Sequence, residues 1–568
     1  MTDFTLSTAA TAVLRDAHAG LRERLSGHAA GDRRTILAFV VASLAPLALG
    51  LAFGLAAALA RGGFVAFDPE TAYRLLTLHG TSVFFWWLYL AQAALMVTFA
   101  AGESAGGLAA RPLILAGLVV LVAGMVLSEG TALTRTALLY DANPDLGRED
   151  PAAVAGMAGG YLLLGLGLTL ASLGAIVTVL RARDEDGGMT AMGFGVLAWA
   201  GFLIVSAIAA VNAFLPNLLW ALDRGPFPVH AATEWHILFH NLHYLPLMAA
   251  VLTWYAITRE TTGIGSVFGA TFSKIVFAAY LVFVPPTSLY HMFLEPDLAE
   301  SVRVVGTLLS LFVSVPTLIA FLVIVSSLEV STRATGETSG LFGWIGRLPW
   351  RDPSFSAMGV AIVSTLLGLV FALVLIQEKF APLISDTFFV PGYFHFFAVG
   401  AVSQSFLAAF LMILPALTGR RVWRPRLLAL LPWVVLAGLL IFGASGIVAG
   451  FEGVPRRTFD VGYDGAAPAS WAALMRGVAI GGVIFATAFA IEVFGLVMTF
   501  FGSTEAGEER ALARPSPVVV ENARPVAAWT GPIAIVVLVV LMTGATIGAF
   551  ELMHALPITT IGGAGHGH

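Results

Sequence analysis

The chain has 568 residues, of which 58% are hydrophobic and 11% are charged, whereas soluble domains carry about 25% charged residues. Its formal net charge is -5 and its mean hydropathy is +0.87, so a soluble enzyme is excluded and nucleic-acid binding has no support. There is no cysteine, which excludes disulfides and thiolate metal sites. We expect an all-α fold, a polytopic membrane helix bundle.

Thirteen apolar runs are long enough to cross a bilayer, which requires about 20 residues each. In chain order they are 36–60, 74–101, 112–134, 157–181, 190–216, 231–257, 270–293, 302–328, 355–377, 388–416, 427–450, 470–502 and 528–555. The sequence therefore predicts one membrane domain over residues 36–556. A cytoplasmic N-terminal segment, 1–35, precedes it and a flexible tail, 557–568, follows it.

The distribution of basic residues predicts the orientation of the bundle. The N-terminal segment contains five arginines and no apolar core near its start, which is typical of a cytoplasmic segment and not of a cleaved signal peptide. With thirteen spans, 20 of the 30 Lys and Arg residues fall on the N-terminal side of the membrane. Cytoplasmic loops carry such an excess, so we expect the N-terminus inside and the C-terminus outside.

Histidines are the main candidate functional residues of the apolar spans. Six lie inside spans and away from the chain termini: His79, His236, His240, His243, His291 and His395. A lone intramembrane histidine is more often a hydrogen-bonded group between helices than a ligand. However, four different spans place theirs at a similar depth near the outer side. Since ionisable groups in the bilayer are costly, this convergence favours a haem or metal site.

The tenth span opens with a tyrosine and a histidine close together. Residues 389–395 read FVPGYFH, so Tyr393 and His395 are separated by about 200° around a helix and can serve two different sites. Downstream, Arg456 and Arg457 stand together in a loop on the outer side. Paired guanidinium groups suit bidentate binding of carboxylates such as haem propionates.

The sixth span presents a stripe of histidines. His236, His240 and His243 follow one another at positions i, i+4 and i+7, and Tyr244 lies beside them. The stripe fits either a set of metal ligands or a polar seam between two helices.

At this point the chain resembles subunit I of the haem–copper oxidase superfamily, most closely that of the B-type cytochrome c oxidases, which has thirteen helices. The resemblance rests on LTLHG (76–80), FHNLHY (239–244), YHMFLEPD (290–297), GLFGWIGRLPW (340–350), VPGYFHF (390–396) and VPRR (454–457). It implies a respiratory oxidoreductase of the bacterial inner membrane that transfers electrons from an external donor to O₂ or NO. It also implies a small membrane-anchored partner subunit, cupredoxin-like or cytochrome c-like.

The resemblance assigns one haem and puts a second in question. It implies that His79 and His395 are the axial ligands of a low-spin haem, with a b-type haem expected. Arg456 and Arg457 correspond to the pair that binds its propionates. Tyr393 stands where the family has the histidine that binds a second, high-spin haem.

The copper site of the family is altered in the same way. His240 corresponds to the first copper ligand, and Tyr244 to the tyrosine covalently linked to that ligand. His291 corresponds to the second of two adjacent copper-binding histidines. Tyr290 stands where the family has the first of that pair.

These departures leave several interpretations open. Tyr393 could bind a second haem as a phenolate, and His236, His243 or Tyr290 could complete a site for copper or another metal. Alternatively, the binuclear centre has been lost and the chain is a non-catalytic, electron-transfer b-type cytochrome subunit. A haem-poor structural or sensory paralogue is a third interpretation.

The proton route that the B-type enzymes build along spans six and eight is also thinned. Tyr255 and Thr317 fit it, whereas their helical neighbours Ala320 and Val323 cannot carry a proton.

Overall fold

The computed structural model describes residues 20–186, 189–263, 265–285, 300–334, 339–377, 380–458, 462–503 and 531–555. Within these residues, 11 helical segments are long and apolar enough to cross a membrane. Two shorter apolar helices, Gly269–Phe283 and Pro532–Gly548, accompany them. The described part of the chain contains no named strand, so the predicted all-α bundle is confirmed and its helix number agrees with thirteen spans.

The helices begin where the sequence supplies caps and prolines. Asp68 and Asp352 each accept a hydrogen bond from a backbone N–H in the first turn, and each precedes a proline, which suits the first helical position. In chain order the elements are α2 (Leu21–Gly27), α3 (Ala30–Arg61), α4 (Pro69–Gly80), the π-helix η1 (Thr81–Trp87), α5 (Leu88–Glu103), α6 (Arg111–Thr134), α7 (Pro151–Asp186), α8 (Ala191–Ala221), α9 (Ala231–Thr262), α10 (Gly269–Phe283), α11 (Glu300–Val313), α12 (Val315–Ala334), the 3-10 turn η3 (Ile345–Arg347), α13 (Pro353–Leu375), α14 (Ala381–Ile384), α15 (Phe389–His395), the π-helix η4 (Phe396–Ser403), α16 (Gln404–Thr418), α17 (Pro425–Phe451), the 3-10 turn η5 (Tyr463–Gly465), α18 (Ala469–Thr499) and α19 (Pro532–Ala555).

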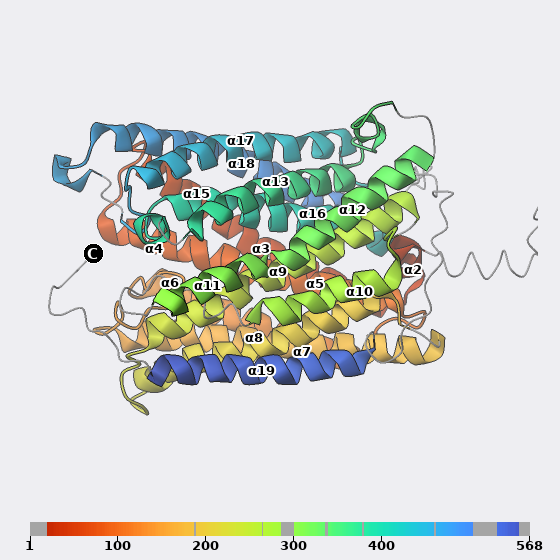
Figure 1. Ribbon diagram of the computed structural model, residues 1–568, viewed down its shortest axis with the longest axis horizontal. Helices are drawn as coiled ribbons and strands as arrows, with labels where there is room; N and C mark the ends of the chain where they lie inside the picture. Colours follow the sequence, from red (N-terminus) through yellow and green to blue (C-terminus); the bar gives the residue numbers. More distant parts are fainter. Residues whose placement is uncertain are drawn as a thin grey trace, which may run out of the picture.

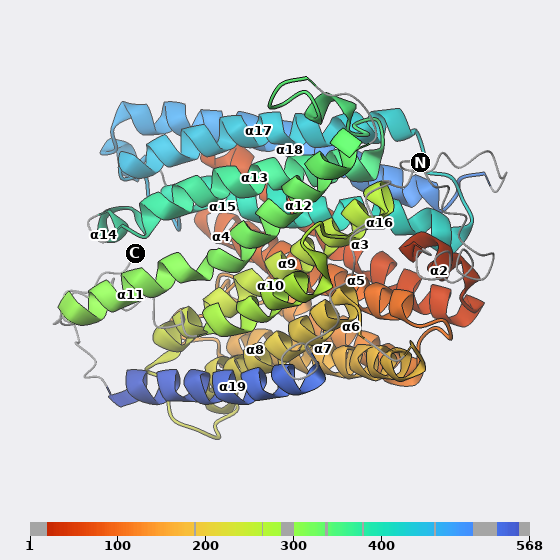
Figure 2. The ribbon, with the colours of Figure 1, turned by 45° about the vertical axis from the view of Figure 1, so that its right-hand side comes forward.

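The long helices lie side by side along one axis of the molecule (Figure 1). Helices α17 and α18 pack together along one edge, α7, α8 and α19 lie along the opposite edge, and α9 and α12 run between them (Figures 1 and 2). Helix α2 marks one end of the bundle, which we call the α2 end. The loop Val454–Arg457 lies at the other end, which we call the arginine end.

Two long spans change from α-helix to π-helix within two residues after a candidate histidine. His79 is followed by η1 (Thr81–Trp87), and His395 is followed by η4 (Phe396–Ser403). Such π segments are rare and occur frequently at functional sites. The predicted span 302–328 is likewise divided into α11 and α12, because Pro316 lacks the N–H that a continuous helix requires.

Some predicted features lie outside the described residues. They are the first 19 residues, the tail 557–568, Tyr290 and His291. His236 lies in α9, but its side chain is also outside this set.

Candidate cofactor site

The side chains of His79 and His395 face each other from α4 and α15. Their ring centroids are 6.4 Å apart and their planes differ by 7°. Nδ1 of His79 donates to the carbonyl oxygen of Gly50 at 2.8 Å, and Nδ1 of His395 donates to that of Pro391 at 2.7 Å. These bonds fix both tautomers and leave each Nε2 as the nitrogen able to bind a metal.

The spacing of the two rings fits one metal ion between them. An imidazole nitrogen lies about 2.0–2.1 Å from a bound transition metal and about 1 Å from its own ring centre, so two rings on one ion have centroids about 6 Å apart. The observed 6.4 Å and the nearly parallel planes agree with this value. The pair is therefore suited to axial ligation of a haem iron.

Glycines on α3 make room for His79. Gly50 and Gly54 have the G-x-x-x-G spacing that allows two membrane helices to approach closely. A methyl group on Gly54 would lie 2.5 Å from Nδ1 of His79. On the other side, the ring of His395 packs against Phe442 of α17 and Phe485 of α18, with centroid distances of 4.5 and 6.1 Å. Both rings are thus confined by packing.

The arginine loop is held by the end of α3. Arg61 donates from Nη1 to the carbonyl oxygen of Arg456 and from Nη2 to that of Pro455, both at 2.7 Å. The guanidinium group of Arg456 pairs with Asp386 at 2.7 Å, and its backbone N–H donates to the Asp386 carbonyl oxygen at 3.1 Å. The loop is therefore fixed by its backbone, and its two guanidinium groups are placed by a rigid frame.

Asp141, in the loop after α6, lies in the field of this arginine pair. Burial raises the pKa of Asp141, and the charges of Arg457 and Arg456 oppose that rise. Burial lowers the pKa of Arg457, but nearby groups, Asp141 first among them, raise it by more. Oδ1 of Asp141 and Nε of Arg456 are buried without a hydrogen-bond partner among the described residues. An anionic group such as a haem propionate fits the guanidinium side of this arrangement.

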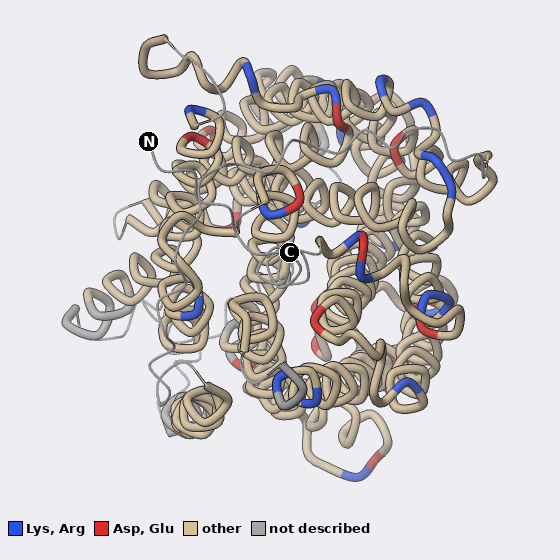
Figure 3. Tube along the Cα trace, turned by 90° about the vertical axis from the view of Figure 1, so that its right-hand side faces the viewer, with Lys and Arg blue, Asp and Glu red and all other residues tan. Residues whose placement is uncertain are grey.

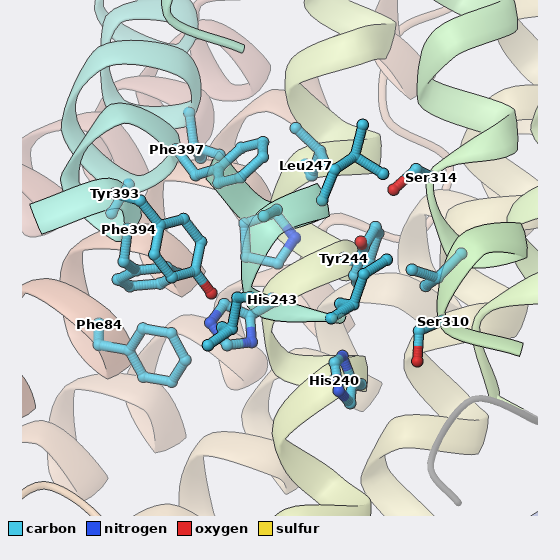
Figure 4. Close-up of a pocket in the computed structure, with 18 of the residues that line it drawn as sticks. Phe84, His240, His243, Tyr244, Leu247, Ser310, Ser314, Tyr393, Phe394 and Phe397 are labelled. Carbon is cyan, nitrogen blue, oxygen red and sulfur yellow. The ribbon is translucent and has the colours of Figure 1, made fainter. Parts of the chain in front are cut away.

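A cavity lies next to the histidine pair. Tyr393 and Phe394 line it from α15, while Tyr244 lines it from α9 and Ser314 from the break between α11 and α12 (Figure 4). Since Phe394 directly precedes His395, one short helix lines both sites.

Two of the predicted metal ligands line this cavity. His240 and His243 both reach it from α9, and their ring centroids are 6.3 Å apart. Tyr244 lies 6.3 Å from His240 by the same measure. Nδ1 of His243 donates to the Phe239 carbonyl oxygen at 2.9 Å, which leaves its Nε2 for the cavity. Among the described side chains, no three His, Asp or Glu residues form a ready metal cluster.

A second, smaller cavity adjoins the first and shares lining residues with it. Tyr244, Ser314 and Thr317 line it. Beyond it, the buried hydroxyl of Tyr280 on α10 is 2.8 Å from that of Thr317. Tyr280 thus supplies a hydroxyl group in the region where Ala320 and Val323 have none.

Residues 34–484 match the family described as "Cytochrome C and Quinol oxidase polypeptide I". The chain belongs to this family. It is 26% identical over 497 residues to the cytochrome c oxidase subunit 1 of Thermus thermophilus, covering 82% of this chain and 84% of that protein. A probable cytochrome c oxidase subunit 1-beta of Nocardia farcinica is 26% identical over 305 residues, 53% of this chain and 49% of that protein.

The fold is also similar to that of a heme-copper terminal oxidase dimer solved by cryo-EM. The TM-score is 0.75 at 21% identity, with 92% of this chain and 91% of the other covered. Family membership confirms the resemblance at the level of subunit I of the haem–copper oxidases, a family of multi-pass membrane proteins that bind haem and copper and associate with other subunits. The B-type assignment and the two replacements of histidine by tyrosine stay predictions.

Three buried polar residues of this subunit were not singled out by the sequence reasoning. Tyr280 bonds to Thr317, and Glu492 of α18 accepts a hydrogen bond from Gln404 of α16. The signal for Glu492 was present, because a carboxyl group within an apolar span is rare. No sequence pattern indicated the partners, which are 37 and 88 residues away along the chain.

Proposed function

We propose that the chain is the haem-bearing subunit of a respiratory oxidoreductase. In this proposal it carries electrons from an external donor through a low-spin haem, held by His79 and His395, to an altered O₂- or NO-reducing site in the cavity. One observation carries the proposal: the rings of the two histidines face each other, nearly parallel, with their centroids 6.4 Å apart. We propose that this haem is b-type.

A low-spin haem, when bound, supplies reversible one-electron transfer. The bonds from Nδ1 of His79 and His395 to backbone carbonyl groups hold the imidazoles in one orientation. Arg456 and Arg457 would bind the propionates, because their loop is held rigidly at the arginine end. These four residues bind and orient the group.

The cavity is the proposed reducing site. Tyr393 places a phenol there, which could bind a second haem as an anionic oxygen ligand and would then favour ferric iron. The proposed ligands for copper or another metal are His240, His291, His236 and His243. Tyr244 and Tyr290 are the proposed tyrosines of the reaction, as hydrogen donors or as oxygen ligands. Phe397 and other apolar side chains line the cavity beside Tyr244.

The proposed orientation places the α2 end in the cytoplasm of a bacterium. Arg22 and Arg24 of α2 and Arg33 and Arg34 at the start of α3 lie at this end, which faces the viewer in Figure 3, as expected for a cytoplasmic face. The arginine end then faces outward. A small membrane-anchored partner subunit, cupredoxin-like or cytochrome c-like, is proposed to deliver electrons there.

A second candidate function is that of an electron-transfer b-type cytochrome without a reducing site. The observation in its favour is that Tyr393, at the position that the resemblance assigns to a haem-binding histidine, places a phenol in the cavity. The histidine pair would serve this function equally well.

Cofactor content separates the two functions. We expect the purified protein to contain two haems and one further, non-haem metal ion per chain, measured by pyridine haemochrome and elemental analysis. One haem and no non-haem metal would refute the oxidoreductase and favour the cytochrome. His79→Ala and His395→Ala should each abolish the low-spin spectrum, whereas His230→Ala, at the start of α9 and outside both sites, should retain it. Retention by both ligand variants would refute the haem assignment.

A further inference from the structure

Glu492 is a carboxyl group buried in the apolar helix α18. It is 2% exposed, and its neighbour Gln404, at the start of α16, is 0% exposed. Nε2 of Gln404 donates to Oε2 of Glu492 at 2.9 Å. Ionisable side chains inside membrane helices are rare and usually functional, and neither proposed cofactor site uses this one.

The hydrogen bonds of this pair are incomplete in a way that favours a neutral acid. Oε1 of Glu492 and Oε1 of Gln404 are both buried without a partner among the described residues. A carboxylate stabilised by one neutral donor is costly to bury. A protonated carboxyl group has a hydrogen to donate, and the free amide oxygen of Gln404 is an acceptor for it. The pair is thus suited to hold one exchangeable proton.

No charged group of the described chain lies at the depth of Glu492 on the elements that pack against α18, namely α3, α16 and α17. Helix α16 has no charged residue, and those of α3 and α17 lie near the helix ends. They are Asp32, Arg33, Arg34 and Arg61 on α3 and Arg426 on α17. On α18 itself, Arg476 lies about four turns toward the arginine end. A charge on the nearby haem site would therefore act on Glu492 with little competition.

The distance to that site follows from helix geometry. Phe485, whose ring is 6.1 Å from that of His395, is seven residues before Glu492 on α18. At 1.5 Å per residue, Glu492 lies about 10 Å further along the helix axis, so we take about 12 Å as its distance from a haem iron bound by His395. It lies on the side of that haem facing the α2 end.

We propose that Glu492, with Gln404, is a proton site linked to the redox state of the low-spin haem. At pH values where Glu492 is ionised while the haem is oxidised, reduction of the haem by the external donor leads the carboxylate of Glu492 to take up one proton from water at the α2 end, and reoxidation releases it. The only bond formed is O–H, and the added proton balances the added electron. The inference rests on the proposed haem at His79 and His395, but not on chemistry in the cavity.

The expected size of the effect follows from Coulomb's law. One elementary charge about 12 Å away, at an effective dielectric constant of about 20, changes proton affinity about tenfold. A tenfold change for a one-electron couple equals about 59 mV of midpoint potential. At low pH, Glu492 is protonated in both redox states and the midpoint potential is constant. At high pH, Glu492 is ionised in both redox states and the midpoint potential is again constant. Between these two plateaus, the midpoint potential should fall by about 59 mV in total as pH rises.

A potentiometric titration of the low-spin absorption band at a series of pH values tests this on the full-length, haem-loaded protein. We expect Glu492→Gln to keep the haem and to lose the pH-dependent fall. An infrared difference spectrum between the reduced and oxidised protein should contain a carboxylic acid band that is missing from this variant. If the hydrogen bond between α16 and α18 is purely structural, Glu492→Gln will change the thermal stability and keep the pH dependence of the midpoint potential. That result would overturn the proposal.

Glu129→Gln is the matched control, because Glu129 is a carboxyl group in α6 that accepts a hydrogen bond from Ser82 near His79. Loss of the pH dependence in Glu129→Gln, with retention in Glu492→Gln, would overturn the assignment. If Glu492→Gln does not fold, the same titration of the wild-type protein is the test. A midpoint potential that does not depend on pH would refute the role of Glu492 and leave the haem assignment intact. Absence of any low-spin band refutes both the haem assignment and this inference.

Discussion

Gly54→Ala should impair haem binding without changing any proposed ligand. The added methyl group would lie 2.5 Å from Nδ1 and 2.6 Å from Cε1 of His79, whereas ordinary contacts begin at 3.4 Å. The imidazole, or the whole of α3, must therefore move by about 0.9 Å. Such a movement either breaks the hydrogen bond of His79 to Gly50 or turns Nε2 away from the iron position.

The size of the effect follows from the cost of overpacking. Forcing an extra methyl group into a packed site typically costs about 1–3 kcal/mol. If that strain falls on the haem-bound state, affinity drops about 5- to 150-fold, since each 1.4 kcal/mol is tenfold. Haem titration of the apo-protein, followed by the low-spin band, measures this. Gly165→Ala on α7 is the control, because a methyl group there has nothing within 4 Å. Equal haem affinities for the two variants would refute the packing argument.

Three further outcomes are expected. Arg457→Gln should speed haem transfer to apomyoglobin about 10- to 150-fold, because a charge-assisted bond contributes about 1.5–3 kcal/mol; an unchanged rate would contradict propionate binding. Burial raises the pKa of Asp141 in the folded state. The contribution of its neutral form to the free energy of unfolding is therefore complete below the ordinary Asp pKa, and it is lost as pH rises through the raised pKa. Asp141→Asn should therefore flatten the pH dependence of the unfolding temperature over this range, and a parallel profile would count against it. Tyr280→Phe removes the hydroxyl 2.8 Å from Thr317 and should slow turnover severalfold at constant haem content; equal rates would rule out a proton relay there.

The sequence was informative about the fold because apolar runs translate directly into membrane helices. It also singled out His79 and Tyr393, since polar side chains in an apolar span need a use; the structure places His79 opposite His395 and Tyr393 at the cavity, and their roles stay predictions. The π-helical turns were not predictable, because η1 and η4 consist of apolar residues with no distinguishing period. Pairings such as that of Glu492 with Gln404 depend on the packing of helices distant in sequence, so a single chain gives no sign of them.

Helix α15 gives the two proposed cofactor positions a fixed separation. Tyr393 and His395 are two residues apart on one short helix, so covalent geometry sets the gap between the groups they would bind. Sliding or tilting of neighbouring helices, or a change in bilayer thickness, would carry both groups together. Because tunnelling rates depend steeply on distance, electron transfer between them should be insensitive to lipid composition and solvent viscosity. Variation in turnover between membranes would then arise at donor docking or proton delivery.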